Sequence, residues 1–335
     1  MSKRKDNEQQ PPSPLLIPHS SLLTPHSPLP ISPPWLFLLL LLITSCPQQT
    51  QKNGFLIAVS IPPQAWFVSQ IAGDKVHTVT LAGPGQNPHN YEPSPKQIQG
   101  LALARAWILS GSEFEISLKP KVTALFSNLL IVDGTEGVQF RVLEEHDDDE
   151  IFSTKEHFSY EIDRHTWLGR EPAKILAAHI RDTLFYIDSA NEEYYREQCE
   201  ALINLIDDEF DRLKIELAPL YGKRVFVYHP SFGYFLDEFN IFQEAVETGG
   251  KEPGPRELNN LTARLNEEQA AFIFVQTQFP SNAAKAVASA TGAELISLDP
   301  LAENWLENIR YMGMILKMSI LQTSTSSNNQ AGAMP

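Results

Sequence analysis

Short β-branched and aromatic runs alternate with segments of helical periodicity along most of the chain. In the first half, the pattern predicts strands at residues 55–60, 76–82, 105–110 and 129–133, and helices at 62–72, 95–104 and 113–126. In the second half, it predicts strands at 224–229, 242–246, 271–276 and 294–299, and helices at 231–238, 255–268, 281–291 and 303–321. This alternation is typical of parallel sheets that helices cover on both faces. We therefore expect an α/β protein with two lobes, each built on roughly four parallel strands.

Between the two halves, residues 171–188 and 191–217 form long amphipathic segments without a strand. Pro172 suits the first turn of a helix, and Pro219 with Gly222 ends the second segment. A helical connector at 171–218 is stiffer than a Gly/Ser linker. The predicted domains are an N-terminal lobe at 46–170 that includes an irregular acidic loop at 134–164, this connector, a C-terminal lobe at 219–322, and a disordered tail at 323–335.

Residues 1–45 have the features of an export signal. Three basic residues stand at positions 3–5, and the apolar run at 35–43 is too short to cross a membrane. The intervening n-region is unusually rich in Pro and Ser, a composition that cannot pack a core. Ile43-Thr44-Ser45-Cys46 resembles a bacterial lipobox, which implies cleavage before Cys46 and its acylation. The alternative is an ordinary signal peptide with an incidental Cys. Either way, we expect the mature protein in the periplasm or on the outer face of the cytoplasmic membrane.

The composition excludes several classes of protein. Lys and Arg number 26 against 41 Asp and Glu, a net charge of −15, and no basic cluster follows the first residues, so nucleic acid is not an expected partner. With 42% apolar and 20% charged residues, the chain is neither wholly disordered nor a polytopic membrane protein. Two cysteines cannot build a disulfide framework or a thiolate cluster, and Cys199 lies at helical spacing with apolar residues, as a buried hydrophobe would.

Four residues that can bind a metal fall where predicted strands end. His89 lies in the loop after the second strand, His165 ends the long loop, and His229 and Asp299 each close a strand before a proline. Ligands of open α/β sheets bind beyond the carboxyl ends of strands. Three imidazoles and one carboxylate suit Zn²⁺ better than Ca²⁺ or Mg²⁺. Because the four residues are far apart in the sequence, their spacing alone leaves the existence of a metal site open.

The segments around these residues read NPHNYEPSP at 87–95, DRHTWL at 163–168, YHPSFGYF at 228–235, EPGP at 252–255 and DPL at 299–301. In this order they resemble the receptors that serve zinc and manganese ABC importers. The chain is most similar to the zinc-binding, ZnuA-like branch of the TroA-type (cluster A-I) solute-binding proteins. The resemblance covers nearly all of residues 54–321.

The resemblance implies a TroA-like fold with a rigid helical spine and a function without catalysis. Such a receptor captures Zn²⁺ between its lobes and delivers it to the permease and ATPase of an ABC importer, as a monomer that touches the membrane only through its lipid anchor. The ligand positions map onto His89, His165, His229 and Asp299. Manganese receptors usually carry Glu at the third position, so His229 favours zinc over manganese. The alternatives are a manganese or iron receptor of the same family, a zinc metallohydrolase, for which no His-Glu-x-x-His segment exists, or a surface adhesin lipoprotein.

The chain also departs from the family pattern. Arg164 precedes His165 where the family often has Pro, and Gln276 stands where Glu is common. The long His-rich loop of zinc members is reduced to an acidic run at 144–150 that contains His146, with His157 beyond it. These two histidines could form a weak auxiliary site that captures metal. The simpler interpretation is that they are incidental residues of a solvated acidic loop.

Overall fold

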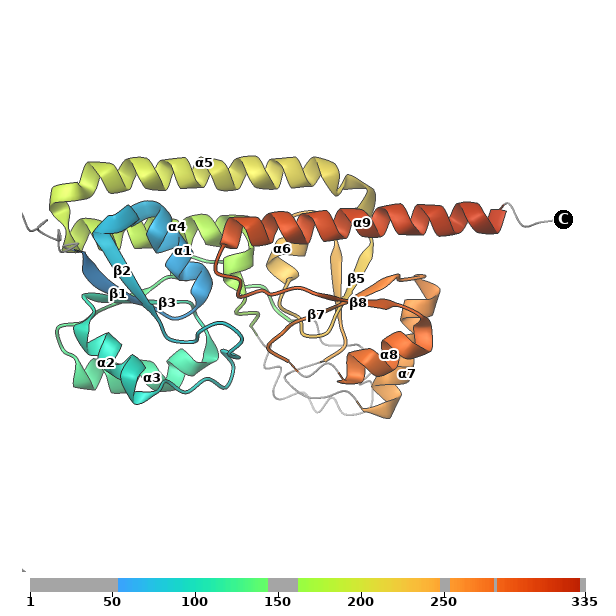
Figure 1. Cartoon of the computed structure of the whole chain (residues 1–335), viewed down its shortest axis with the longest axis horizontal. Coiled ribbons are helices and arrows are strands. Elements are labelled where there is room, and N and C mark those ends of the chain that lie inside the picture. The colour runs from blue at the N-terminus through green and yellow to red at the C-terminus, as the bar shows by residue number, and fades with distance from the viewer. Residues whose placement is uncertain (1–53, 144–161, 248–253, 280–281, 332–335) are drawn as a thin grey trace, which may run out of the picture. The chain divides into compact units, whose positions relative to one another are not determined.

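The computed structural model describes residues 54–143, 162–247, 254–279 and 282–331, which contain two four-stranded sheets flanked by helices (Figure 1). The first sheet has the order β2-β1-β3-β4, and the second has the order β6-β5-β7-β8. Every pair of neighbouring strands is parallel. The strands of the first sheet are β1 (Phe55–Val59), β2 (Val76–Thr80), β3 (Ala106–Leu109) and β4 (Leu130–Asp133). Those of the second are β5 (Arg224–Val227), β6 (Phe242–Ala245), β7 (Phe272–Val275) and β8 (Glu294–Ser297). The α/β fold class with two parallel sheets is confirmed.

The helices lie where the periodicity predicts them, with small shifts at their ends. The first half contains α1 (Pro62–Ala72), α2 (Pro95–Leu103) and α3 (Glu113–Leu125). The second half contains α6 (Gly233–Asp237), α7 (Pro255–Glu267), α8 (Asn282–Thr291) and α9 (Trp305–Ala331). One helix is longer than expected: α9 continues through most of the segment predicted as a disordered tail. No Pro or Gly, the residues that disfavour a helix most, stands between residues 314 and 331.

Alternate residues of each central strand face different hydrophobic clusters. In β1, Ile57 and Val59 belong to a large core, whereas Ala58 faces a smaller cluster under α2 and α3. In β5, Val225 and Val227 belong to the same large core, whereas Phe226 faces a third cluster against α7 and α8. The large core therefore runs through both sheets, and each sheet has its own second core on the opposite face.

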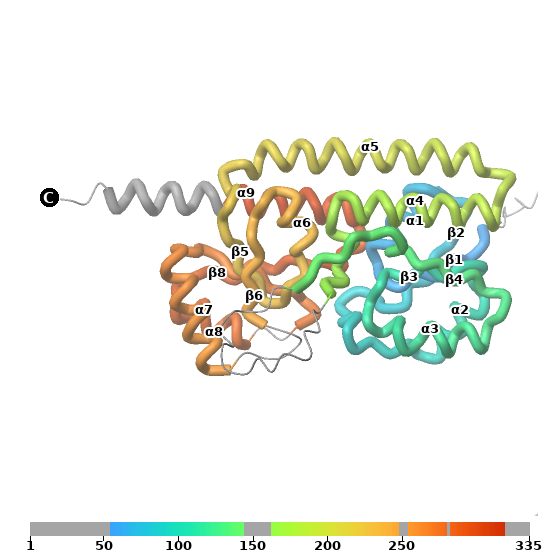
Figure 2. Tube along the Cα trace, turned by 180° about the vertical axis from the view of Figure 1, so that it is seen from behind, coloured from blue at the N-terminus to red at the C-terminus, as the bar shows by residue number. Residues whose placement is uncertain are grey.

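Two long helices follow the first sheet, α4 (Arg170–Ile187) and α5 (Glu192–Glu216). Both pack on α1, and α5 also packs on α9 and leads into the second sheet (Figures 1 and 2). The buried stripe of α5 includes Cys199, as its spacing predicts, together with Ile206 and Phe210. The ring of Trp305, at the start of α9, lies 5.0 Å from that of Phe67 in α1 and 6.4 Å from that of Phe210. The long helix thus joins the lobes through a shared core. The predicted domain boundaries remain predictions.

The strand order creates an equivalent crevice in each sheet. In the first sheet, the chain passes from β1 to β2 on one side and later to β3 on the other side of β1. The second sheet repeats this arrangement around β5, between β6 and β7. Loops that leave neighbouring strands in opposite directions open a ligand site at the carboxyl ends. In the described part of the chain, none of the helices has the length and apolar character that a membrane span requires.

Candidate metal centre

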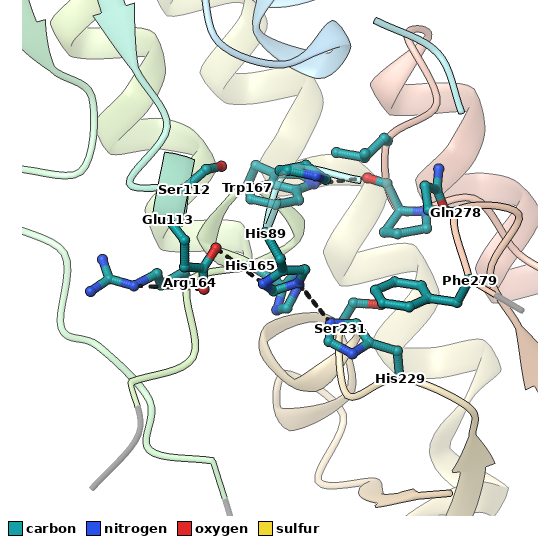
Figure 3. A pocket seen from close by; sticks show the side chains of 13 residues that line it. His89, Ser112, Glu113, Arg164, His165, Trp167, His229, Ser231, Gln278 and Phe279 are labelled. Atoms are coloured by element: carbon teal, nitrogen blue, oxygen red, sulfur yellow. Dashed lines mark hydrogen bonds and ion pairs between the residues drawn. The ribbon is translucent and has the colours of Figure 1, made fainter. Parts of the chain in front are cut away.

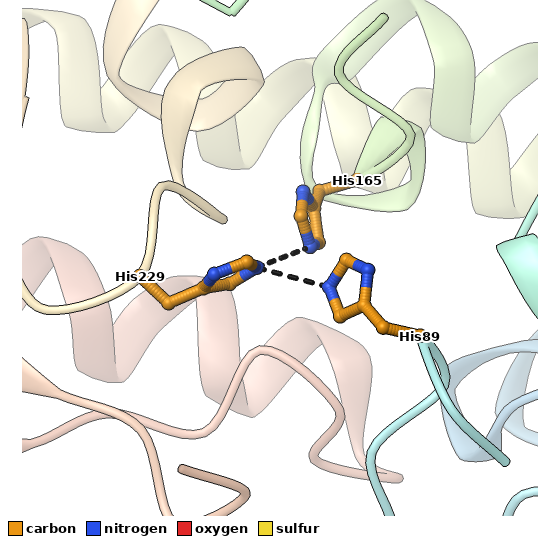
Figure 4. A group of neighbouring side chains, drawn as sticks. All are labelled: His89, His165 and His229. Atoms are coloured by element: carbon orange, nitrogen blue, oxygen red, sulfur yellow. Dashed lines mark hydrogen bonds between the residues drawn. The ribbon is translucent and has the colours of Figure 1, made fainter. Parts of the chain in front are cut away.

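Three predicted ligands meet in one place. His89 lies in the loop after β2, His165 directly precedes the short 3₁₀ helix Thr166–Leu168, and His229 lies two residues beyond β5. The Nε2 atom of His229 lies 3.0 Å from Nε2 of His89 and 3.3 Å from Nε2 of His165 (Figure 4). The ligand atoms of the three residues lie within 4.8 Å of one another. Three nitrogen atoms that converge this closely can share one cation as ligands.

A carboxylate stands behind each imidazole ring. The Nδ1 atom of His89 lies 3.1 Å from Oε2 of Glu113, at the start of α3 (Figure 3). The Nδ1 atom of His165 lies 2.8 Å from Oδ1 of Asp163. The remaining pair joins Nδ1 of His229 to Oε2 of Glu247 over 2.6 Å. A carboxylate at Nδ1 holds the proton there, so the Nε2 lone pair remains available for a metal.

These carboxylates are not among the residues predicted from the sequence, although a signal for two of them exists. Glu113 is the first residue of α3, after β3, and Glu247 lies two residues beyond β6. Both therefore lie near the strand ends at which open α/β sheets bind their ligands. Asp163 stands two residues before His165 in the sequence.

The electrostatics of the group favour a neutral His229 and charged Glu113 and Asp163. Burial lowers the pKa of His229 well below its ordinary value, and the neighbouring His165 and His89 lower it further. Burial raises the pKa of Glu113 and of Asp163, but hydrogen bonds and charge interactions with the neighbouring histidines, and with Arg141 in the case of Asp163, together more than offset this, so both pKa values are lowered. A neutral imidazole is the form that coordinates a metal.

A pocket of about 350 Å³, part of it open to solvent, surrounds the three histidines and is lined by residues of both lobes. The ring of Phe279 stacks on His229 at 4.2 Å, and Trp167 meets the ring of His165 at 5.5 Å (Figure 3). Arg164 donates a hydrogen bond from Nη1 to the carbonyl oxygen of Gly111. The remaining lining residues are Pro88, Ser112, Glu113, Ser231, Gln278, Pro300 and Leu301. Aromatic and proline side chains thus limit the access of water to the ring nitrogens.

The structure does not bring Asp299 into this group. Its Oδ1 atom accepts hydrogen bonds from Nε2 of Gln278, at 2.6 Å, and from the backbone N–H of Leu301, at 2.9 Å. Gln276, by contrast, supports a ligand: it donates to the carbonyl oxygen of His229 and accepts from the N–H of the same residue. The proposed lipidation site Cys46 and the proposed auxiliary residues His146 and His157 lie outside the described residues.

The chain is similar to known proteins along most of its length. The sequence model of the family described as ZnuA, zinc-uptake complex component A, periplasmic, matches residues 57–319. The high-affinity zinc uptake system protein ZnuA of Yersinia pestis is 26% identical over 281 residues, which cover 78% of this chain and 88% of that protein. The manganese ABC transporter substrate-binding lipoprotein PsaA of Streptococcus anginosus is 25% identical over 256 residues, which cover 74% of this chain and 82% of that protein. A crystal structure of ZnuA matches with a TM-score of 0.72 and 31% identity, covering 79% of this chain and 99% of that chain.

Proposed function

Because the chain belongs to the ZnuA family of substrate-binding receptors for metal ABC importers, which are not enzymes, we propose that it captures Zn²⁺ at His89, His165 and His229. It then delivers the ion to the permease and ATPase of such an importer. The observation that carries this proposal is the convergence of three Nε2 atoms, each on a ring whose Nδ1 atom faces a carboxylate.

The ligand set supports zinc as the cargo. Among the relatives are both a zinc uptake protein and a manganese receptor, so relationship alone does not choose between the metals. Imidazole nitrogens suit zinc, whereas manganese prefers sites rich in carboxylate oxygens. His229 supplies the third nitrogen, and burial keeps its ring neutral.

A fourth ligand completes the tetrahedron that zinc prefers. We propose Asp299 for this role, because it follows β8 at the carboxyl edge of the second sheet and next to Pro300, which lines the pocket. To reach the ion, Asp299 exchanges its hydrogen bond with Gln278 for the metal. A water molecule is the alternative. The variant Asp299→Asn, which keeps the shape and removes the charge, loses zinc affinity only if the carboxylate binds.

Outside the described residues, the sequence supports an anchored receptor. Cleavage before Cys46 and acylation of that residue would place the mature chain at the outer face of the cytoplasmic membrane or in the periplasm. We propose that it acts there as a monomer. The variant Cys46→Ser is expected to leave the membrane fraction. If it sediments with membranes as the wild type does, the lipid anchor is wrong.

Calorimetric titration of metal-free protein tests the proposed function. We expect one Zn²⁺ per chain, tighter binding of Zn²⁺ than of Mn²⁺, and a severe loss of affinity in His229→Ala. The control is His77→Ala, which removes an exposed histidine on β2. Tighter binding of Mn²⁺, or wild-type zinc affinity in His229→Ala, would contradict the proposal.

A further inference from the structure

An arginine outside the metal centre joins the two lobes beside it. Arg141 follows the first sheet, and its Nη1 atom lies 3.1 Å from Oδ2 of Asp163. Its Nε atom donates to Oδ2 of Asp237, in α6 of the second lobe, over 2.6 Å. The Asp163 side chain is 0% exposed and that of Arg141 is 13% exposed, whereas Asp237 is 54% exposed. One guanidinium thus pairs with a buried carboxylate on one side and a solvated carboxylate on the other.

Hydrogen bonds of the backbone fix this arginine in place. The N–H of Arg141 donates to the hydroxyl oxygen of Tyr234, and that hydroxyl donates to the carbonyl oxygen of Asp163, both over 2.9 Å. The carbonyl oxygen of Arg141 accepts from the N–H of Asp163. At the start of α6, Gly233 leaves room for the guanidinium, since a Cβ atom there would overlap it. The segment after β4 runs from the first sheet to the second in Figure 2.

The two oxygens of Asp163 have different partners. Oδ2 faces Arg141, and Oδ1 accepts from both the backbone N–H and the Nδ1 atom of His165. A carboxylate held on both sides cannot turn away from the ring that it orients. The α6 helix begins four residues after His229, so the same arginine is tied to the segments that carry two of the three histidines.

We propose that Arg141 is a positioning residue for metal capture and release. Arg141 fixes the carboxylate of Asp163, which orients His165. It also joins the segment before His165 to α6, which follows His229. This inference rests on the proposed function. Because ligands from both lobes must separate before the ion leaves, the link through Arg141 slows zinc dissociation. Because it also holds His165 in the tautomer that can bind, it keeps association fast.

Three variants separate the parts of this link. Arg141→Met removes both ion pairs, Gly233→Ala displaces the guanidinium without a change of charge, and Asp237→Asn removes only the solvated pair on α6. Loss of a group that supports a metal ligand typically costs about 10–100-fold in affinity, the range expected for Arg141→Met. Loss of the exposed ion pair with Asp237 is expected to lower zinc affinity by about two- to fivefold. Arg181→Met, which removes an arginine paired with exposed Asp182 on α4, is the matched control.

Stopped-flow transfer of zinc to a chromophoric chelator measures dissociation. We expect the fastest release in Arg141→Met, then Gly233→Ala, then Asp237→Asn. Association should slow only in Arg141→Met and Gly233→Ala, in which His165 loses its fixed tautomer, and both rates of the Arg181→Met control should equal those of the wild type. If Arg141→Met does not fold, the other two variants carry the test, because Asp237 is largely solvated. Wild-type dissociation rates in every folded variant would overturn the proposal.

Nitrogen NMR of His165 in the metal-free protein tests the positioning role without any zinc. We expect one tautomer in the wild type, with the proton on Nδ1, and a mixture of tautomers in Arg141→Met or Gly233→Ala. Identical ring-nitrogen shifts in all three proteins would overturn the role of Arg141. A wild type that binds no zinc at all would contradict the proposed function instead, and the NMR comparison would still decide the role of Arg141.

Discussion

At the scale of the residue, the candidate metal centre places a carboxylate behind each of three imidazole rings. Two of the three carboxylates also face an arginine: Asp163 lies beside Arg141, and Oε1 of Glu113 lies 3.8 Å from Nε of Arg164. An arginine on the far side of a carboxylate reduces the negative potential that the imidazole transmits to the ion. The proposed site therefore offers a dication little excess negative charge, which would suit a receptor that must also release its cargo.

Glu247 offers a direct test of the carboxylates. In Glu247→Gln, the side chain keeps its shape, but the group at Nδ1 of the buried His229 loses its charge. We expect zinc affinity to fall by about 10–100-fold. The amide no longer fixes the His229 ring, and it raises the basicity of that ring less than the carboxylate does. Calorimetric titration measures the loss, with the exposed Glu294→Gln as control. An unchanged affinity would show that Glu247 does not support the ligand.

The pH dependence of stability follows from His229. Its pKa is lowered in the folded protein, so below its ordinary value of about 6.5 the unfolded chain binds the additional proton. The metal-free protein should therefore lose stability as the pH falls from about 7 to 5, with no contribution from this group above 7. Thermal unfolding across this range is expected to show a steeper decline for the wild type than for His229→Gln. Parallel curves would contradict the buried neutral ring.

The histidines of the site could be predicted from the sequence, but their surroundings could not. Each ligand follows a strand or a loop at the carboxyl edge, a position that periodicity reveals. The partners Glu113 and Glu247 come from other strand ends, and only tertiary structure decides which carboxylate meets which ring. Pattern reasoning also placed Asp299 near the end of a strand, but it could not show that its carboxylate accepts hydrogen bonds from Gln278 and Leu301, so its role as a ligand stays a proposal.

At the scale of the element, the fit of α9 against α5 depends on one small residue. Gly313 lies within α9 and is buried against Leu213 of α5.

The order of strands and helices along the chain could be predicted from periodicity because it is local. The end of α9 could not be predicted, since Ser, Thr and Asn residues weaken a helix without ending it. The shared core under α5 and α9 could not be predicted either, because it forms between segments far apart in the sequence.

Gly313→Ala should destabilise the protein despite the better helix propensity of alanine. A Cβ atom at this position overlaps the Leu213 side chain. Overpacking costs about 1–3 kcal/mol, whereas the gain in propensity is about 1 kcal/mol. Urea unfolding measures the difference, and the double variant with Leu213→Ala should lose less stability than the sum of the single variants. Higher stability of Gly313→Ala would contradict the close contact.

At the scale of the whole molecule, the shared core ties both sheets to the metal centre. Nε1 of Trp305 donates to the carbonyl oxygen of Trp167, and Nε1 of Trp167 donates to that of Pro300. These bonds connect α9, the segment that carries His165, and the segment after β8. A core common to both lobes favours small adjustments around the pocket over a wide opening of the lobes.

The shared core predicts that the lobes unfold together. The metal-free protein should show one transition in which tryptophan fluorescence and far-UV circular dichroism coincide. Zinc at 1,000 times its dissociation constant should add about 4 kcal/mol to the free energy of unfolding, and His229→Ala should abolish this gain. Two separate transitions would show that the lobes are independent.

Zinc K-edge absorption spectroscopy of the protein loaded with one equivalent of zinc decides whether the three imidazoles bind the ion. We expect three imidazole nitrogens at about 2.0–2.1 Å from the zinc, and one fewer in His229→Ala. A shell made mainly of oxygen atoms, or one with the same number of imidazoles in the wild type and in His229→Ala, would contradict this prediction.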